Sequence, residues 1–192
     1  MSDPFGPAVA EHKRLVEWLD GQIELLRRIG QATVDAVAAD RRVYLIGNGG
    51  SAADAQHIAA ELVGQFKRLR RALPAVALTT DTSSILSISN DYGFGHVFAR
   101  QVEALVRAGD VVWALSTSGN SPNIIEAVHV ARAAGAAVVG FAGRTGGKLK
   151  PLCDLCLCVD HESSDRIQEI HQLAYHMICD FIEQRFVRPQ NK

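Results

Sequence analysis

Short apolar segments alternate with longer amphipathic segments along most of the chain. The apolar segments are rich in valine, alanine and leucine, are bounded by glycine, aspartate or serine, and span residues 41–47, 74–80, 110–116, 136–143 and 155–160. Because they show no polar alternation, the pattern predicts strands that are buried on both faces.

Helical spacing of apolar residues predicts helices over residues 51–66, 94–109, 121–135 and 163–186. Strands that alternate with helices indicate an α/β domain with a doubly wound, parallel, five-stranded sheet of the flavodoxin-like kind. In such sheets, ligands bind beyond the carboxyl ends of the strands, at the point where the strand order reverses.

A further helical stripe, over residues 8–40, precedes the first strand. Gly21 and Gly30 interrupt it, which predicts two helices or one bent helix. We therefore divide the chain into an N-terminal helical extension (residues 1–40) and the α/β domain (residues 41–192). Such an extension caps its own core or packs against another subunit, and the length of the stripe slightly favours the second role.

Composition and charge narrow the range of partners. With 192 residues, of which 47% are hydrophobic and 21% charged, the chain fits a single domain. A formal net charge of -1 gives no overall attraction to nucleic acid or to an anionic membrane. The N-terminal residues lack a basic segment followed by an apolar one, and no apolar run is long enough to span a bilayer, so we expect a cytoplasmic protein.

The four cysteines agree with that compartment. Cys153, Cys156 and Cys158 lie in or beside the last apolar segment, and Cys179 lies in the final helical segment. A zinc site built from cysteines would need a second pair at ligand spacing, so buried thiols without disulfides are the favoured interpretation.

Two polar loops follow predicted strands. The first, GNGGSA at residues 47–52, matches the G-x-G-x-x-A pattern of a dinucleotide-binding turn, and Asp81 after the next strand is placed to hold a ribose. A Walker-type loop is excluded, because no Gly-Lys-Ser/Thr follows the glycines.

The second loop, STSGNS at residues 116–121, carries four hydroxyl side chains in six positions. Pro122 suits the first turn of a helix, so Ser121 is the expected N-cap. Hydroxyls and backbone N–H groups at a helix N-terminus bind phosphate without a lysine, which favours a sugar phosphate over a nucleotide.

Two predicted helices carry residues that bind metals or move protons. His57 and Glu61 lie one turn apart on one helical face, and Gln168 and His176 lie two turns apart on the final helix. On spacing alone, structural histidines are the favoured interpretation.

Several segments together resemble a known family. GNGGSAADAQH, STSGNS, ISNDYGFGHVFARQVEAL and DRIQEIHQLAYH are similar to the sugar isomerase (SIS) domain and, within it, to bacterial phosphoheptose isomerases, over about residues 40–187. The resemblance implies interconversion of sedoheptulose 7-phosphate and D-glycero-D-manno-heptose 7-phosphate by proton transfer between C1 and C2, a step toward ADP-heptose and lipopolysaccharide core sugars. It also implies a homo-oligomer, commonly a tetramer with active sites between subunits.

The resemblance implies roles for individual residues as well. His57, Glu61, Gln168 and His176 would bind one zinc ion per subunit, with Glu61 and His176 also as base and acid, although a metal-bound histidine nitrogen cannot carry a proton. The expected substrate ligands are Ser51, Ser116, Thr117, Ser118 and Ser121 for the phosphate, Asn48, Asp91 and Asp165 for sugar hydroxyls, and Gly49, Gly50, Asn90, Glu61 and Gln168 beside them. Asp165 could instead cap the final helix, Asp91 could stabilise a turn, and His171 is expected to pack or to lie behind the site.

One position departs from the family pattern. Gln65 stands where many phosphoheptose isomerases have arginine, and the basic residues Lys67, Arg68, Arg70 and Arg71 either replace that charge or form a solvated face. Two other functions stay open: a non-catalytic SIS adaptor of the bacterial replication initiator, in which the histidine and glutamate positions are generally replaced, and a nucleotide-binding oxidoreductase.

Overall fold

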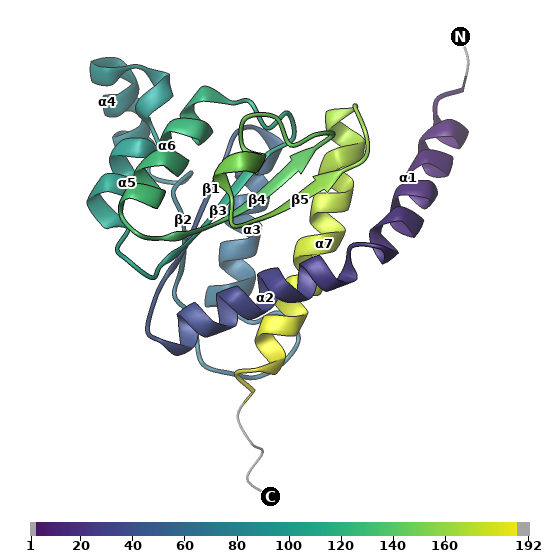
Figure 1. Ribbon diagram of the computed structural model, residues 1–192, viewed down its shortest axis with the longest axis horizontal. Coiled ribbons are helices and arrows are strands. Elements are labelled where there is room, and N and C mark those ends of the chain that lie inside the picture. The colour runs from purple at the N-terminus through teal and green to yellow at the C-terminus, as the bar shows by residue number, and fades with distance from the viewer. Residues whose placement is uncertain (1–2, 188–192) are drawn as a thin grey trace, which may run out of the picture.

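The computed structural model describes residues 3–187 and contains a five-stranded, all-parallel sheet (Figure 1). The strands are β1 (Val43–Gly47), β2 (Ala75–Ala77), β3 (Val111–Ser116), β4 (Ala137–Gly143) and β5 (Leu155–Val159). Their order is β2-β1-β3-β4-β5, so the direction of winding reverses between β1 and β3. The predicted doubly wound α/β architecture is confirmed.

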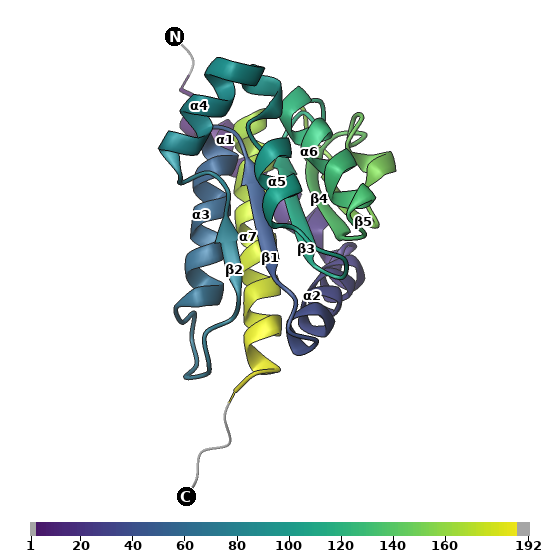
Figure 2. The same ribbon diagram turned by 90° about the vertical axis from the view of Figure 1, so that its left-hand side faces the viewer.

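Helices cover both faces of the sheet (Figures 1 and 2). They are α1 (Phe5–Asp20), α2 (Ile23–Ala38), α3 (Gly50–Val63), α4 (Thr82–Tyr92), α5 (Ala99–Leu105), α6 (Pro122–Ala133) and α7 (Ser164–Gln184), with short 3₁₀ turns at Phe94–His96 and Lys150–Leu152. Within the described residues, none of these helices is long and apolar enough to cross a membrane.

Alternate side chains of the strands belong to two separate cores. Val43 and Leu45 of β1 pack with α2, α3 and α7, whereas Tyr44 and Ile46 pack with α5 and α6. Strands β1 and β3 are buried along their whole length, as predicted, because helices cover both of their faces. The edge strand β2 exposes Val76.

The N-terminal region forms two helices that break at Gly21. The expected interruption at Gly30 is wrong, because this glycine lies inside α2, where a Cβ atom would meet Phe181 Cδ1 at 2.6 Å. Helix α2 covers the core, whereas α1 buries only Leu15 and Leu19 and runs outward beside the start of α7 (Figure 1).

The segment between β2 and β3 differs most from the sequence prediction. Helix α4 was not predicted, and it places Asp91 in its last turn rather than in a loop. The helix expected over residues 94–109 is reduced to a 3₁₀ turn and the short α5. None of the residues of α4 is buried, so an apolar stripe could not mark it.

Candidate active site

The two polar loops lie at the carboxyl ends of β1 and β3, where the strand order reverses. They are joined by Asn48 and Asn123, whose side-chain amides exchange two hydrogen bonds of 2.8 and 2.9 Å. Asn48 is thus paired in this structure, and Asn123 is a site residue that the sequence did not indicate. The pair holds the start of α3 beside the start of α6.

The glycines of the first loop permit a close approach between α3 and α7. Gly49 has a φ of 53° at the N-cap of α3, and a Cβ atom on Gly50 would lie 2.4 Å from Gln168 Oε1. Asp81, the expected ribose ligand of a nucleotide site, instead caps α4 by accepting a hydrogen bond from the Ser84 backbone N–H at 3.1 Å. Asp81 is therefore used as a helix cap and is not free to hold a ribose, which argues against the nucleotide-binding alternative.

The serine loop has hydroxyls that already face one another. Ser116 Oγ lies 3.1 Å from Ser121 Oγ, and Ser118 Oγ accepts a hydrogen bond from the Asn120 backbone N–H at 3.1 Å. Ser121 occupies the N-cap position of α6, as predicted, but its side chain makes no capping hydrogen bond. Pro122 has no N–H and the Ile124 N–H donates to the Ser121 carbonyl at 3.1 Å, so the Ser121 hydroxyl and the Asn123 N–H are the groups that this helix end offers to an anion.

His57, Glu61 and His176 converge between α3 and α7, which run side by side (Figure 2). His57 Nε2 lies 2.9 Å from Glu61 Oε1 and 3.5 Å from His176 Nε2. Tetrahedral ligands at zinc–nitrogen distances of about 2.0–2.1 Å lie about 3.3 Å from one another. The three donor atoms all lie within 4.8 Å of one another, so they could hold a metal ion.

Gln168, the fourth expected ligand, has a different partner in this structure. Its Nε2 donates a hydrogen bond of 2.9 Å to Asp54 Oδ2.

The cluster favours a neutral His176. Burial lowers the pKa of His176, and the neighbouring His57 lowers it further, while Glu61 opposes the shift. The ring of Phe66 stacks on His176 with a centroid distance of 5.6 Å. A neutral imidazole offers a lone pair, which a cation or a proton can use.

Asp54 and Tyr175 lie next to this cluster, on the Nδ1 side of the His57 ring. Both are buried, and burial raises the pKa of Asp54, while hydrogen bonds from Gln168 and Tyr175 oppose that shift. The sequence carried a usable signal, since Asp54 precedes His57 by one turn and lies among the apolar positions Ala55, Ile58 and Leu62.

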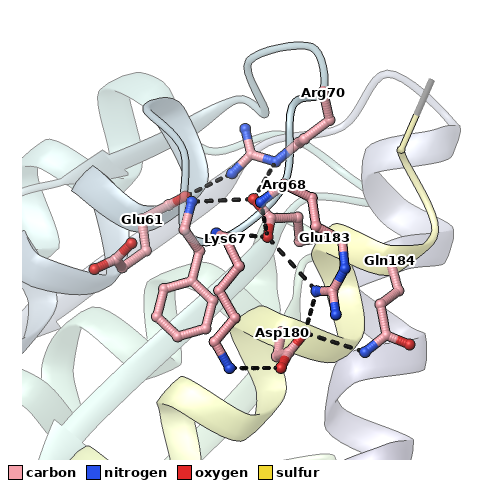
Figure 3. A network of polar contacts seen from close by, with 8 residues as sticks. Glu61, Lys67, Arg68, Arg70, Asp180, Glu183 and Gln184 are labelled. Carbon is pink, nitrogen blue, oxygen red and sulfur yellow. Dashed lines mark hydrogen bonds and ion pairs between the residues drawn. The ribbon is translucent and has the colours of Figure 1, made fainter. Parts of the chain in front are cut away.

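The basic residues after α3 form a network with the end of α7 (Figure 3). Lys67 Nζ lies 2.8 Å from Asp180 Oδ2, and Arg68 pairs with the same carboxylate. Arg70 is buried, and its Nε atom lies 3.4 Å from Glu183 Oε1. Its Nη2 atom donates a hydrogen bond to the Glu61 backbone carbonyl. Arg70 is therefore a buried structural residue, whereas Lys67 is exposed and pairs with Asp180 at the surface.

The remaining expected sugar ligands do not touch the cluster. Asn90 donates a hydrogen bond of 2.8 Å to Asp91 on α4. Asp165 lies in the first turn of α7, where the Ser163 hydroxyl, followed by hydrogen bonds from Arg166, lowers its pKa to about 2. Ser163 occupies the N-cap position that was considered for Asp165.

The cysteines are free thiols, as expected. A hydrogen bond with Cys153, together with burial, raises the pKa of Cys156 to about 12, and burial raises the pKa of Cys179 to about 12. Neutral thiols are poor metal ligands and poor nucleophiles.

Comparison with known proteins identifies the family. Residues 9–143 match the family model described as SIS domain. The phosphoheptose isomerase of Geobacter sulfurreducens is 52% identical over 186 residues, covering 96% of this chain and 98% of that protein. The phosphoheptose isomerase of a Roseiflexus species is 51% identical over 165 residues, covering 86% of this chain and 84% of that protein.

The chain belongs to the phosphoheptose isomerase family. A solved structure of the phosphoheptose isomerase from Neisseria gonorrhoeae has the same fold, with a TM-score of 0.85 and 43% identity over 94% of this chain and 95% of that chain. The resemblance predicted from the sequence is confirmed. The adaptor alternative is not favoured, because the near full-length relatives are isomerases and His57, Glu61, Gln168 and His176 are all present.

Proposed function

We propose that this protein interconverts sedoheptulose 7-phosphate and D-glycero-D-manno-heptose 7-phosphate, in the biosynthesis of ADP-heptose and lipopolysaccharide core sugars. The observation that carries the proposal is the convergence of His57, Glu61 and His176 on the helix that begins at the glycine loop and on its neighbour α7. The family relationship supports the same reaction.

The reaction moves one proton between neighbouring carbons. In the ketose-to-aldose direction, a base removes a proton from C1, the C–H electrons form a C1–C2 double bond, and the C2 oxygen takes up a proton. Return of a proton to C2 and loss of the C1 hydroxyl proton then give the aldose. We assign the carbon-bound proton to the Glu61 carboxylate and the oxygen-bound proton to the His176 imidazole.

His57, Glu61 and His176 would hold zinc, with Gln168 as a fourth ligand once its amide leaves Asp54. When bound, the ion polarises the substrate carbonyl as a Lewis acid. A histidine that binds zinc through Nε2 has no proton there to give, so His176 acts in one of the two roles at a time.

The serine loop and the start of α3 would bind the phosphate. Ser116, Thr117, Ser118 and Ser121 provide hydroxyls at the N-terminus of α6, and Ser51 provides one at the N-terminus of α3. The Asn48–Asn123 pair supports this role, because it fixes the spacing of the two helix ends. A Cβ atom on Gly49 would meet no other atom, which leaves room for the substrate beside Ser51, whereas the Gln168 side chain fills the space beside Gly50.

Asn90, Asp91 and Asp165 would contact sugar hydroxyls in the assembled protein. Asn90 and Asp91 lie on the exposed α4, away from the cluster, so a site shared between subunits of a homotetramer accounts for their participation. A cytoplasmic location, with one zinc ion per subunit, completes this proposal.

The direct test is turnover. Protein supplied with zinc and sedoheptulose 7-phosphate should generate aldose signals in proton NMR, and Glu61→Gln should lower kcat by about 100- to 10,000-fold because it removes a general base. Glu24→Gln makes the same chemical change on the exposed face of α2 and should keep the wild-type rate. Wild-type protein that forms no aldose would contradict the proposal.

A further inference from the structure

A buried hydrogen-bond chain lies directly behind His57. The Tyr175 hydroxyl is 3.3 Å from Asp54 Oδ1 and 3.4 Å from His57 Nδ1. Tyr175 is 0% exposed and Asp54 is 2% exposed. His57 Nε2 faces the opposite way, toward Glu61 and His176. One ring nitrogen of His57 thus faces the candidate metal site, and the other faces the buried chain.

The positions of the protons set the direction of each hydrogen bond between Asp54, Tyr175 and His57. Asp54 Oδ2 already accepts a hydrogen bond from the Gln168 amide, and Oδ1 faces the single proton of the Tyr175 hydroxyl. A hydroxyl that donates to a carboxylate presents its oxygen lone pairs to its other neighbour. That neighbour is His57 Nδ1. When Nε2 gives its lone pair to a metal ion in place of its contact with Glu61, the single proton of the neutral imidazole lies on Nδ1 and faces this hydroxyl.

We propose that Asp54 and Tyr175 are positioning residues that hold His57 with its proton on Nδ1 and its Nε2 lone pair directed at the metal site. The inference rests on the metal site of the proposed function. A metal-binding histidine usually donates its other N–H to such a partner, and loss of the partner costs about 10- to 100-fold in metal affinity.

Tyr175→Phe isolates the hydroxyl. The ring of Tyr175 packs edge-on against the rings of His57 and His176, with centroid distances of 5.7 and 4.7 Å, and phenylalanine keeps these contacts. Tyr44→Phe is the matched control, because Tyr44 is also buried, lies in the opposite core and donates its hydroxyl proton to the Leu105 carbonyl at 3.1 Å.

The first measurement is the zinc affinity of the full chain, without substrate, by competition with a chromophoric chelator. Tyr175→Phe should weaken zinc binding by about 10- to 100-fold, and Tyr44→Phe should leave it within about twofold of wild type. Asp54→Asn provides a second variant. Its amide can donate to the hydroxyl and turn the hydroxyl proton toward His57, so zinc binding should fall at least as far.

The second measurement reports the hydrogen bond itself. In the zinc-loaded wild-type protein and in Tyr44→Phe, the Nδ1–H of His57 should give a slowly exchanging, downfield proton resonance in the NMR spectrum. In Tyr175→Phe, this resonance should move and exchange rapidly with water, because its acceptor is gone.

The outcomes separate this inference from the proposed reaction. Zinc binding within about twofold of wild type in both Tyr175→Phe and Asp54→Asn overturns the positioning role. A wild-type protein that binds no zinc overturns both the role and the metal site. Zinc affinity that depends on Tyr175, in a protein without isomerase activity, overturns the reaction alone.

Discussion

His171 and His176 lie on the same helix but in different environments. His171 is fully buried, its Nε2 donates a hydrogen bond of 3.0 Å to the Ala142 carbonyl, and burial lowers its pKa to about 4. It is therefore neutral and structural, whereas His176 reaches the cluster with Glu61.

This difference predicts opposite behaviour of two matched variants. His176→Gln should lower isomerase activity by about 100-fold or more, while His171→Gln, which keeps a hydrogen-bond donor, should lose much less. Steady-state rates of both folded variants provide the comparison. Equal losses of activity would contradict these assignments.

His171 should also contribute to acid sensitivity. Its pKa is lower in the folded protein than its ordinary value of 6.5, so its stabilising effect is complete above that pH and is lost as the pH falls toward about 4. Denaturant unfolding at neutral pH and near pH 5 should therefore show a smaller pH-dependent loss for His171→Gln than for wild type. The same loss in both proteins would show that His171 does not titrate in this way.

The sequence identified the three residues of the cluster but not the residues that hold them. Spacing places His57 and Glu61 on one helical face and His176 with Gln168 on the final helix, and the family resemblance implied that they share one site. Asp54 and Tyr175 lie 121 positions apart, and their pairing depends on how α3 packs against α7. Local spacing carries no information on such a contact.

At the scale of elements, the segment after α3 is attached to α7 by one carboxylate. Glu183 is 1% exposed and accepts hydrogen bonds from the backbone N–H groups of Phe66, Lys67 and Arg68 (Figure 3). This attachment holds Phe66 against His176 and fixes the end of the helix that carries Glu61.

Glu183→Gln should therefore destabilise the protein strongly. Its amide group would face N–H donors, and Arg70 would lose its buried counter-charge, so we expect a loss of about 3–5 kcal/mol in the free energy of unfolding. Asp180→Asn, at the partly exposed end of the same network, should cost about 1 kcal/mol or less. Denaturant unfolding measures both values, and similar losses would argue against Glu183 as the main attachment.

Burial explains which elements the sequence revealed. Strands β1 and β3 and helices α3, α6 and α7 each bury a face or a whole segment, so their apolar patterns were readable. Helix α4 has no fully buried residue and packs only the partly buried Ile85 and Ile88 against the core, and its start signal, Asp81, also fitted a ribose ligand. The same polar side chains cap helices and bind ligands, so only the folded structure shows which of the two roles Asp81 has.

At the scale of the whole molecule, α1 leaves apolar surface without a partner within the described chain. Phe5 is 77% exposed and Val9 is 55% exposed, although both lie on a helix that only partly packs against α7. Apolar side chains in such a position favour a contact with another subunit.

We therefore expect a homo-oligomer, a tetramer in the proposal, that uses α1 for assembly. Light scattering of wild-type protein should give an oligomeric mass, and Val9→Asp should lower it, because a charge would be buried at the contact. Glu17→Asp, elsewhere on α1, should leave the mass unchanged. A wild-type protein that is monomeric at working concentration would remove this role.

The parallel pairing of α3 with α7 also matters while the chain is being made. His57 and His176 are separated by 119 positions, and α7 supplies much of the core on its face of the sheet. A chain that stops before α7 has two of the three cluster residues and a sheet face that α2 and α3 cover only in part, and chaperones and proteases recognise such exposed apolar surface. The cluster and the core on this face of the sheet are therefore completed together, when α7 packs against α3.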